Sequence, residues 1–187
     1  MTTLESLYHT AGKPVPEALA NWGSQVTVWC DEYDAAFPSA DLTEIHLEYA
    51  VYIFDLTAER VTLAYALSVE QLMRRDASRI RGFPNVNASV RAVLGEKAFL
   101  ADKGHFLGHV SGGILDINLF PQRRELNRGW SEEGKRFRAI ERYVAAHPGA
   151  FFYHLPRYDD ETWIPAALEY GVLMDDKEWW VERFRNK

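Results

Sequence analysis

Cysteine is almost absent from the sequence, with Cys30 the single one among 187 residues. One cysteine cannot form an internal disulfide, and it cannot supply a zinc site built from several thiolates. Because Cys30 lies in an apolar stretch between Trp29 and Asp31, we interpret it as a packing residue rather than a nucleophile.

Long hydrophobic runs are also missing, since no stretch approaches the roughly 20 residues that span a bilayer. The first 14 residues lack the basic-then-apolar order of a secretory signal. We therefore expect a cytoplasmic protein, or one delivered by a route other than the general secretory pathway, with no membrane partner. The length favours one domain, and 47% hydrophobic content with 26% charged content is typical of a globular chain.

Positive charge is scarce overall, because 21 Lys and Arg face 27 Asp and Glu, a net charge of −6. Taken alone, this total argues against non-specific binding of nucleic acid. The distribution is uneven, however, with net charges of −9 for residues 1–70, +6 for residues 71–142 and −3 for residues 143–187. The acidic total therefore conceals a basic middle segment.

Periodicity in the sequence predicts both strands and helices. Alternating apolar residues indicate a strand over 43–56 and a second over 61–67, which together form a hairpin. Ser68 as an N-cap predicts a short helix over 69–77, and residues 81–87 are predicted to form a loop. We expect a helix within 15–36, and a second that starts at Ser131, covers 134–146 and ends at 147–149. Further strands are expected over 150–158, 162–174 and 177–185. The mixture predicts an α+β fold with an antiparallel sheet and packed helices.

Residues 102–127 place an unusual number of polar side chains between apolar ones. Alternation of Gly104 and Gly108 with apolar residues predicts a strand that carries Lys103, His105 and His109 on one face. We expect a turn at 111–113, and then a short strand over 117–120. A proline is predicted to end that strand, with a loop leading to the helix.

The two histidines of this segment first suggest zinc. On a strand, however, His105 and His109 would lie about 13 Å apart, which is too far for both to bind one ion. Two interpretations remain for them, as satisfied core residues or as a general base beside a hard cation.

Four motifs in this region resemble those of the DNA/RNA non-specific endonucleases with a ββα-metal (His-metal) finger, and most closely the bacterial toxin-type nuclease domains. They are Asp-Lys-Gly-His at 102–105, Asn-Leu-Phe-Pro-Gln at 118–122, Glu-Leu-Asn-Arg-Gly at 125–129 and Arg-Ala-Ile-Glu at 138–141. The family pattern is Asp-Arg-Gly-His, Asn-x-x-Pro-Gln, Leu-Asn-x-Gly and a glutamate in the next helix. The resemblance implies a finger over 102–147 within one nuclease-like domain, 1–187, of which residues 1–90 are little covered.

The resemblance implies a metal-dependent endonuclease that hydrolyses phosphodiester bonds in DNA, RNA or both. It implies His105 as general base, Asn127 as ligand of Mg²⁺ or another hard cation such as Mn²⁺, and Glu141 as the carboxylate that orients metal-bound water. Asp102 would position the histidine strand, and Asn118 would brace the site. Helical geometry independently places Glu141 within about 60° of the centre of the apolar stripe, where a carboxylate needs a partner such as a hydrated cation.

Two positions depart from the family pattern. Lys103 stands where arginine is usual, which keeps the charge but loses the bidentate fork. Ala145 occupies a helical position where the better-known secreted members lead us to expect an arginine. Nearby arginines are candidate substrate-binding residues that compensate for these departures, namely Arg123, Arg124 and Arg128.

Other functions remain open on the sequence alone. The chain could be a nucleic-acid binder that has lost turnover, or an interaction protein whose acidic N-terminal third docks a partner. As a nuclease it could be a toxin effector, which would require an inhibitor or immunity protein in the cell that produces it.

Overall fold

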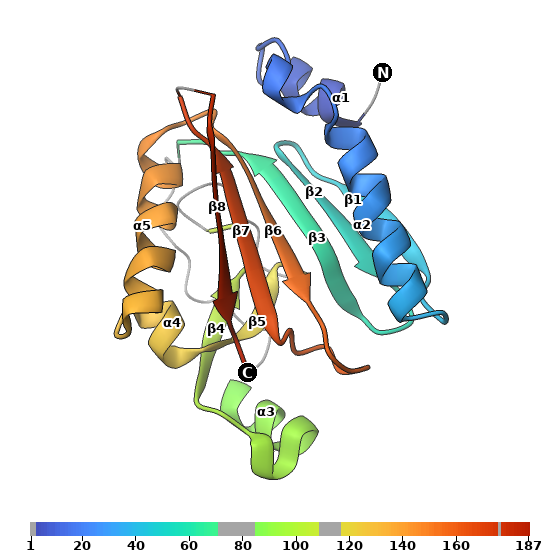
Figure 1. Cartoon of the computed structure of the whole chain (residues 1–187), viewed down its shortest axis with the longest axis vertical. Helices are drawn as coiled ribbons and strands as arrows, with labels where there is room; N and C mark the ends of the chain where they lie inside the picture. Colours follow the sequence, from blue (N-terminus) through green and yellow to red (C-terminus); the bar gives the residue numbers. More distant parts are fainter. Residues whose placement is uncertain (1–2, 71–84, 109–116, 176) are drawn as a thin grey trace.

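A six-stranded antiparallel sheet forms the centre of the computed structural model, which describes residues 3–70, 85–108, 117–175 and 177–187 (Figure 1). Neighbouring strands follow the order β1-β2-β3-β6-β7-β8. Their bounds are β1 (Leu42–His46), β2 (Ala50–Asp55), β3 (Arg60–Leu67), β6 (Phe151–Arg157), β7 (Ala167–Leu173) and β8 (Trp179–Arg185). The predicted α+β class with an antiparallel sheet is therefore confirmed.

Different elements cover the two faces of this sheet (Figure 1). One face packs against α1 (Thr3–Thr10) and α2 (Trp22–Ala36), which are connected through the 3-10 turn η1 (Glu17–Leu19). The other packs against α5 (Glu132–Ala146) and a small unit made of β4 (Ala101–His105), β5 (Leu119–Arg123) and α4 (Arg124–Arg128). Two further elements precede β4, namely α3 (Val86–Leu94) and η3 (Gly95–Lys97).

Successive side chains along the strands point to opposite faces of the sheet and belong to two separate hydrophobic cores. Tyr52 and Phe152 belong to the core beneath α5, whereas Val51 and Phe151, their neighbours in sequence, belong to the core beneath α1 and α2. Strand β3 is buried along its whole length, because it lies centrally in the sheet and both faces are covered. The sheet therefore separates β4, β5 and α4 from the acidic N-terminal helices.

Most predictions for the C-terminal half are confirmed. Helix α5 begins after Ser131, whose hydroxyl accepts a hydrogen bond from the Gly134 amide at 3.0 Å, and it ends at Ala146 before His147. Strands β6, β7 and β8 fall within the three predicted ranges. The early helix is confirmed as α2, although residues 17–19 form a separate 3-10 turn.

One prediction for the N-terminal half was wrong, and one helix was missed. The range 43–56 is two strands, β1 and β2, because a turn at residues 47–49 reverses the chain without any glycine, proline or asparagine. Helix α3 was missed, although Asn85 caps it by accepting a hydrogen bond from the Ala88 amide at 3.1 Å. Ser68 donates its hydroxyl to the Val144 carbonyl at 2.7 Å, and most of the helix that it is predicted to cap lies outside the described residues.

Some predictions fall on parts of the chain outside the described residues. These are most of the helix predicted over 69–77, most of the loop at 81–87 and the turn at 111–113. Among the residues that the structure describes, no helix is both long and apolar enough to cross a membrane.

Candidate functional site

The hairpin of β4 and β5 carries the first two sequence motifs. The strands pair antiparallel, with Lys103 opposite Pro121 and His105 opposite Leu119. Strand β4 ends at His105, earlier than predicted, because the chain bends at residues 106–107, and His109 lies outside the described residues. Pro121 does not end its strand as predicted but lies inside β5. A proline is tolerated there because this two-stranded sheet consists of edge strands, which need no donor on their outer side.

Gly104 allows the two strands of this hairpin to approach closely. A Cβ atom at this position would lie 2.6 Å from Cβ of Gln122, 2.7 Å from its Oε1 and 2.9 Å from Cζ of Phe120. Gln122 and Phe120 are buried, so neither can move aside at little cost. The glycine of the Asp-Lys-Gly-His motif is therefore required by packing next to His105.

Asn118 fixes the chain directly after His105. Its Oδ1 accepts a hydrogen bond from the Leu107 amide at 2.7 Å, and its Nδ2 donates to the Leu107 carbonyl at 2.7 Å. The backbone carbonyl of Asn118 also accepts from the Phe106 amide at 3.0 Å. Asn118 is fully buried, so water does not compete for these bonds. Asn118 therefore holds the backbone of residues 106 and 107 beside the end of β4.

Asp102 connects strand β4 to helix α4. Its carboxylate accepts hydrogen bonds from Nε of Arg124 at 3.1 Å and from Nε and Nη2 of Arg128 at 2.5 and 3.1 Å. Nδ2 of Asn127 lies 3.4 Å from the same carboxylate. Burial alone would raise the pKa of Asp102, but the bonds from Arg128, Arg124 and Asn127 outweigh it and hold that pKa below its ordinary value. The structure thus brings together four of the predicted site residues.

Glu141 lies on α5, on the side that faces the sheet. Its side chain is 23% exposed and pairs with Nη1 of Arg138 at 2.8 Å. Burial raises the pKa of Glu141, even though Arg138 acts in the opposite direction. Burial also raises the pKa of Tyr170 on β7, and the charge of Glu141 raises it further, so the two groups lie near each other. This placement agrees with the inward direction expected from helical periodicity.

The three predicted substrate-binding arginines have different surroundings. Arg123 is 22% exposed and donates to the Glu133 carboxylate at 2.5 Å, which links β5 to α5. Arg124 is 27% exposed, and Arg128 is 44% exposed. Arg128 is therefore the most accessible of the three to a ligand in solution.

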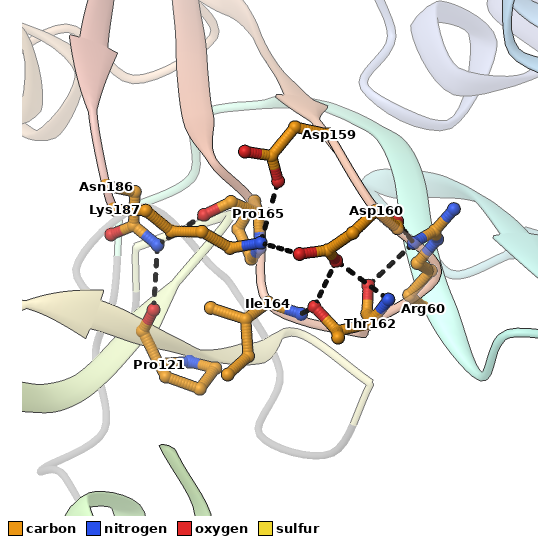
Figure 2. Close-up of polar contacts among 9 residues, drawn as sticks. All are labelled: Arg60, Pro121, Asp159, Asp160, Thr162, Ile164, Pro165, Asn186 and Lys187. Carbon is orange, nitrogen blue, oxygen red and sulfur yellow. Dashed lines mark hydrogen bonds and ion pairs between the residues drawn. The ribbon is translucent and has the colours of Figure 1, made fainter. Parts of the chain in front are cut away.

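Asn186 ties strand β5 to the main sheet (Figure 2). It is fully buried, and its Nδ2 donates to the carbonyls of Pro121 at 3.0 Å and Pro165 at 2.8 Å. Its Oδ1 accepts from the Arg123 amide at 2.9 Å. Next to it, Nζ of Lys187 lies within 2.8 Å of carboxylate oxygens of Asp159 and Asp160 (Figure 2). Sequence reasoning missed Asn186, because a contact between residues 63 positions apart leaves no local pattern.

The oxygen donors of this region suit a hard cation better than a soft one. Within the described ranges, no group of three or more His, Cys, Asp or Glu side chains is arranged to hold a metal ion. A hydrated cation bound through an amide oxygen needs fewer protein ligands than that. Because Nδ2 of Asn127 is directed at Asp102, its Oδ1 is directed away from that carboxylate, where it can serve as a ligand.

Known proteins resemble this chain in three-dimensional fold rather than in sequence. No family model matches the sequence, and no curated protein matches it. The chain is similar to the structure of Sda1 nuclease with bound zinc ion, with a TM-score of 0.50 and 14% identity, over 79% of this chain and 84% of that one. Two other solved structures are less similar in fold.

One of these two is an extracellular endonuclease, with a TM-score of 0.44 and 15% identity over 81% of this chain and 80% of that one. The other is the EndoG/EndoGI complex, with a TM-score of 0.45 and 15% identity over 94% and 82%. The chain therefore shares the fold of a known nuclease, as its motifs predicted.

Proposed function

We propose that the chain is a metal-dependent endonuclease that hydrolyses phosphodiester bonds of DNA or RNA with little sequence preference. The observation that carries the proposal is the set of contacts around Asp102. This carboxylate joins the strand that ends at His105 to the helix that carries Asn127. All four motifs therefore belong to one folded unit, β4-β5-α4-α5, on one face of the sheet.

In this proposal His105 is the general base that takes a proton from the attacking water. An imidazole accepts protons near neutral pH and suits that step. The position of His105 is fixed from two directions, by its pairing with Leu119 and by the bonds between Asn118 and Leu107 just beyond it. A base held this firmly loses little freedom when substrate binds.

Asn127 and Glu141 are the residues that would hold the cation. Asp102 would orient the Asn127 amide so that Oδ1 faces the ion, a common arrangement around metal ligands. Because burial raises the pKa of Glu141, a nearby cation would favour its ionised form. When bound, Mg²⁺ or a similar cation would stabilise charge on the phosphate and on the departing 3′ oxygen.

The test is cleavage of plasmid DNA and of RNA, with Mg²⁺, Mn²⁺, Zn²⁺ or EDTA, by the parent protein and by His105→Ala. We expect cleavage that requires a divalent cation and falls at least about 100-fold in the variant, the scale of a lost general base. His46→Ala is the matched control, because His46 is an exposed histidine paired with Glu44 on the edge strand β1.

Three outcomes of this test differ in meaning. Equal activity in His105→Ala and the parent would remove His105 from the mechanism. Cleavage that persists in EDTA would refute the role of the cation. If neither protein cleaves, the non-catalytic nucleic-acid binder becomes the better description.

We also propose, as the biological form of this activity, that the chain is a toxin effector. Expression inside bacterial cells should then stop growth and degrade nucleic acid, and co-expression of an inhibitor should relieve both effects. His105→Ala should be harmless at the same protein level. Normal growth with intact DNA and RNA would exclude a toxin role.

A further inference from the structure

Trp130 is an exposed tryptophan that follows helix α4 and Gly129. It is 63% exposed, which is unusual for the largest apolar side chain. Helix α4 ends at Arg128, and Gly129 then adopts the left-handed conformation with a φ of 70°, which turns the chain outward. The Trp130 amide donates to the Glu125 carbonyl at 2.9 Å, so the backbone of this exposed residue is fixed.

The indole ring of Trp130 is fixed as well. The guanidinium carbon of Arg128 lies 4.8 Å from the ring centroid, a cation–π contact. Arg128 in turn is held by two hydrogen bonds to Asp102. Because one side of the ring packs on Arg128 and the residue stays largely exposed, a flat aromatic surface remains open to a ligand.

Arg128 supplies the positive charge beside this ring. Arg128 and Arg124 both pair with Asp102, so two guanidinium groups share one carboxylate and one positive charge is left over. A ligand that rests on Trp130 therefore meets the Arg128 guanidinium beside the ring, which suits a ligand with a flat ring and a negative charge.

We propose that Trp130 is a stacking platform for a nucleobase, with the adjoining phosphate of the same strand on Arg128. The inference rests on the proposed function and names its substrate class. A base in a duplex already stacks on its neighbours, so an exposed indole can receive one only from a single strand, a loop or an end. The part of the substrate that meets Trp130 is therefore single-stranded or locally unpaired. Stacking on an aromatic ring is tolerant of sequence, which agrees with cleavage that does not read bases.

The experiment measures binding of labelled dT12 and U12 by fluorescence anisotropy, in EDTA and in the His105→Ala background, so that the oligonucleotides stay intact. A dT12 of the same length with abasic sites at every internal position serves as the probe without bases. We compare Trp130→Ala and Trp130→Phe with the parent background. Trp179→Ala is the matched control, because Trp179 is 37% exposed and packs on Trp22 at the opposite face.

The expected result is that Trp130→Ala binds dT12 about tenfold more weakly, while Trp130→Phe loses less than about threefold, because a smaller ring still stacks. Binding of the abasic probe should be equal in all variants, and Trp179→Ala should match the parent. A similar loss with U12 assigns the platform to RNA as well as DNA, whereas a loss with dT12 alone assigns it to DNA.

The inference is overturned if Trp130→Ala binds dT12 as tightly as the parent, if the loss is equal on the abasic probe, or if the parent binds neither oligonucleotide. Circular dichroism spectra of the variants verify that each is folded. Failure of the proposed function is a different result, namely no cleavage by the protein with His105 intact. Base-dependent binding would survive that failure, so the two conclusions can be separated.

Discussion

The two faces of the central sheet differ in the groups that pack on them. Beneath α1 and α2, Trp22 packs on five other rings, those of Trp29, Tyr65, Phe151, Tyr153 and Trp179, and Tyr33 of α2 donates to the buried Asp55 carboxylate at 2.7 Å. Beneath α5, an apolar core is combined with buried amides and paired charges, such as those of Asn118 and Asp102.

The difference separates stability from function within one fold. Aromatic packing has few directional demands, whereas buried amides and carboxylates hold neighbouring groups at defined positions. All of the predicted site residues that are described lie on α5 or on the unit of β4, β5 and α4, with Asn118 directly before β5, on the same face of the sheet. Substitutions on the two faces should therefore change different measurements, and four experiments examine that expectation.

The largest effect is expected for Trp22→Ala on the aromatic face. Trp22 is 5% exposed, and its removal leaves a large cavity among five rings. The free energy of unfolding should fall by about 3–5 kcal/mol, measured by urea denaturation. Cleavage per folded molecule should stay the same.

Trp130→Ala is the control for Trp22→Ala, since removal of an exposed tryptophan should change the free energy of unfolding little. Loss of activity in fully folded Trp22→Ala, or in the milder Trp22→Phe, would show that the faces are coupled.

Asn127→Ala should have the opposite profile. We expect the cleavage rate to fall about 100-fold with little change in stability, because a metal ligand is lost at a half-buried position. Asn127→Asp, which keeps an oxygen ligand, should recover part of the rate at raised Mg²⁺. Rates are measured across a Mg²⁺ titration. Asn21→Ala, on the aromatic face, is the matched control. An unchanged Mg²⁺ requirement in Asn127→Ala would remove this residue from the cation site.

Acid should destabilise the face beneath α5 through His154. Burial among Tyr170 and Phe137 lowers the pKa of His154 to about 3, whereas an imidazole in an unfolded chain has a pKa of about 6.5. Below pH 6.5 His154 is protonated in the unfolded chain but stays neutral in the folded chain. The free energy of unfolding therefore falls as the pH decreases towards 3. This group alone should cost about 2 kcal/mol between pH 7 and pH 5.

The measurement for this pH effect is urea denaturation at both pH values for the parent and for His154→Phe. The variant should lose less stability between pH 7 and pH 5 than the parent does. Equal losses in the two proteins would mean that His154 is not the group responsible.

The smallest effect is expected for Asp102→Asn. The amide keeps the shape but removes the charge that holds Arg124 and Arg128 and orients Asn127. We expect the cleavage rate to fall about tenfold, as for other residues that orient a metal ligand. Asp31→Asn, at an exposed position on α2, is the control. A rate equal to that of the parent would show that the contacts around Asp102 serve folding alone.

Local signals in the sequence were enough to predict one part of the fold. Ser131 with the acids after it located the start of α5, and acidic turn residues separated β6 from β7. The turn between β1 and β2 was missed, because Leu47, Glu48 and Tyr49 continue the alternating pattern and contain no turn residue. Tertiary pairing with β3 decides the reversal there, and a short window of sequence does not contain that information.

In the candidate site, too, local sequence signals predicted some features, and features that depend on distant contacts were missed. Alternation around Gly104 predicted the strand β4, although the strand ends at His105, earlier than predicted, and the glycine proved to be a packing requirement. The position of Pro121 inside β5 was predicted wrongly, since the sequence does not reveal that the strand is an edge. Asn186 and the exposed ring of Trp130 escaped prediction, because one depends on a distant contact and the other on which side of a turn faces water.

The tryptophan cluster also gives the molecule an optical signal. The ring centroid of Trp22 lies 5.5 Å from that of Trp29 and 6.1 Å from that of Trp179. Indoles this close couple their electronic transitions, so the near-ultraviolet circular dichroism of this chain should report mainly on the packing of α2. The far-ultraviolet signal reports on all helices and strands together. Heating the protein while both signals are recorded would therefore reveal whether the packing around Trp22 is lost before the rest of the fold.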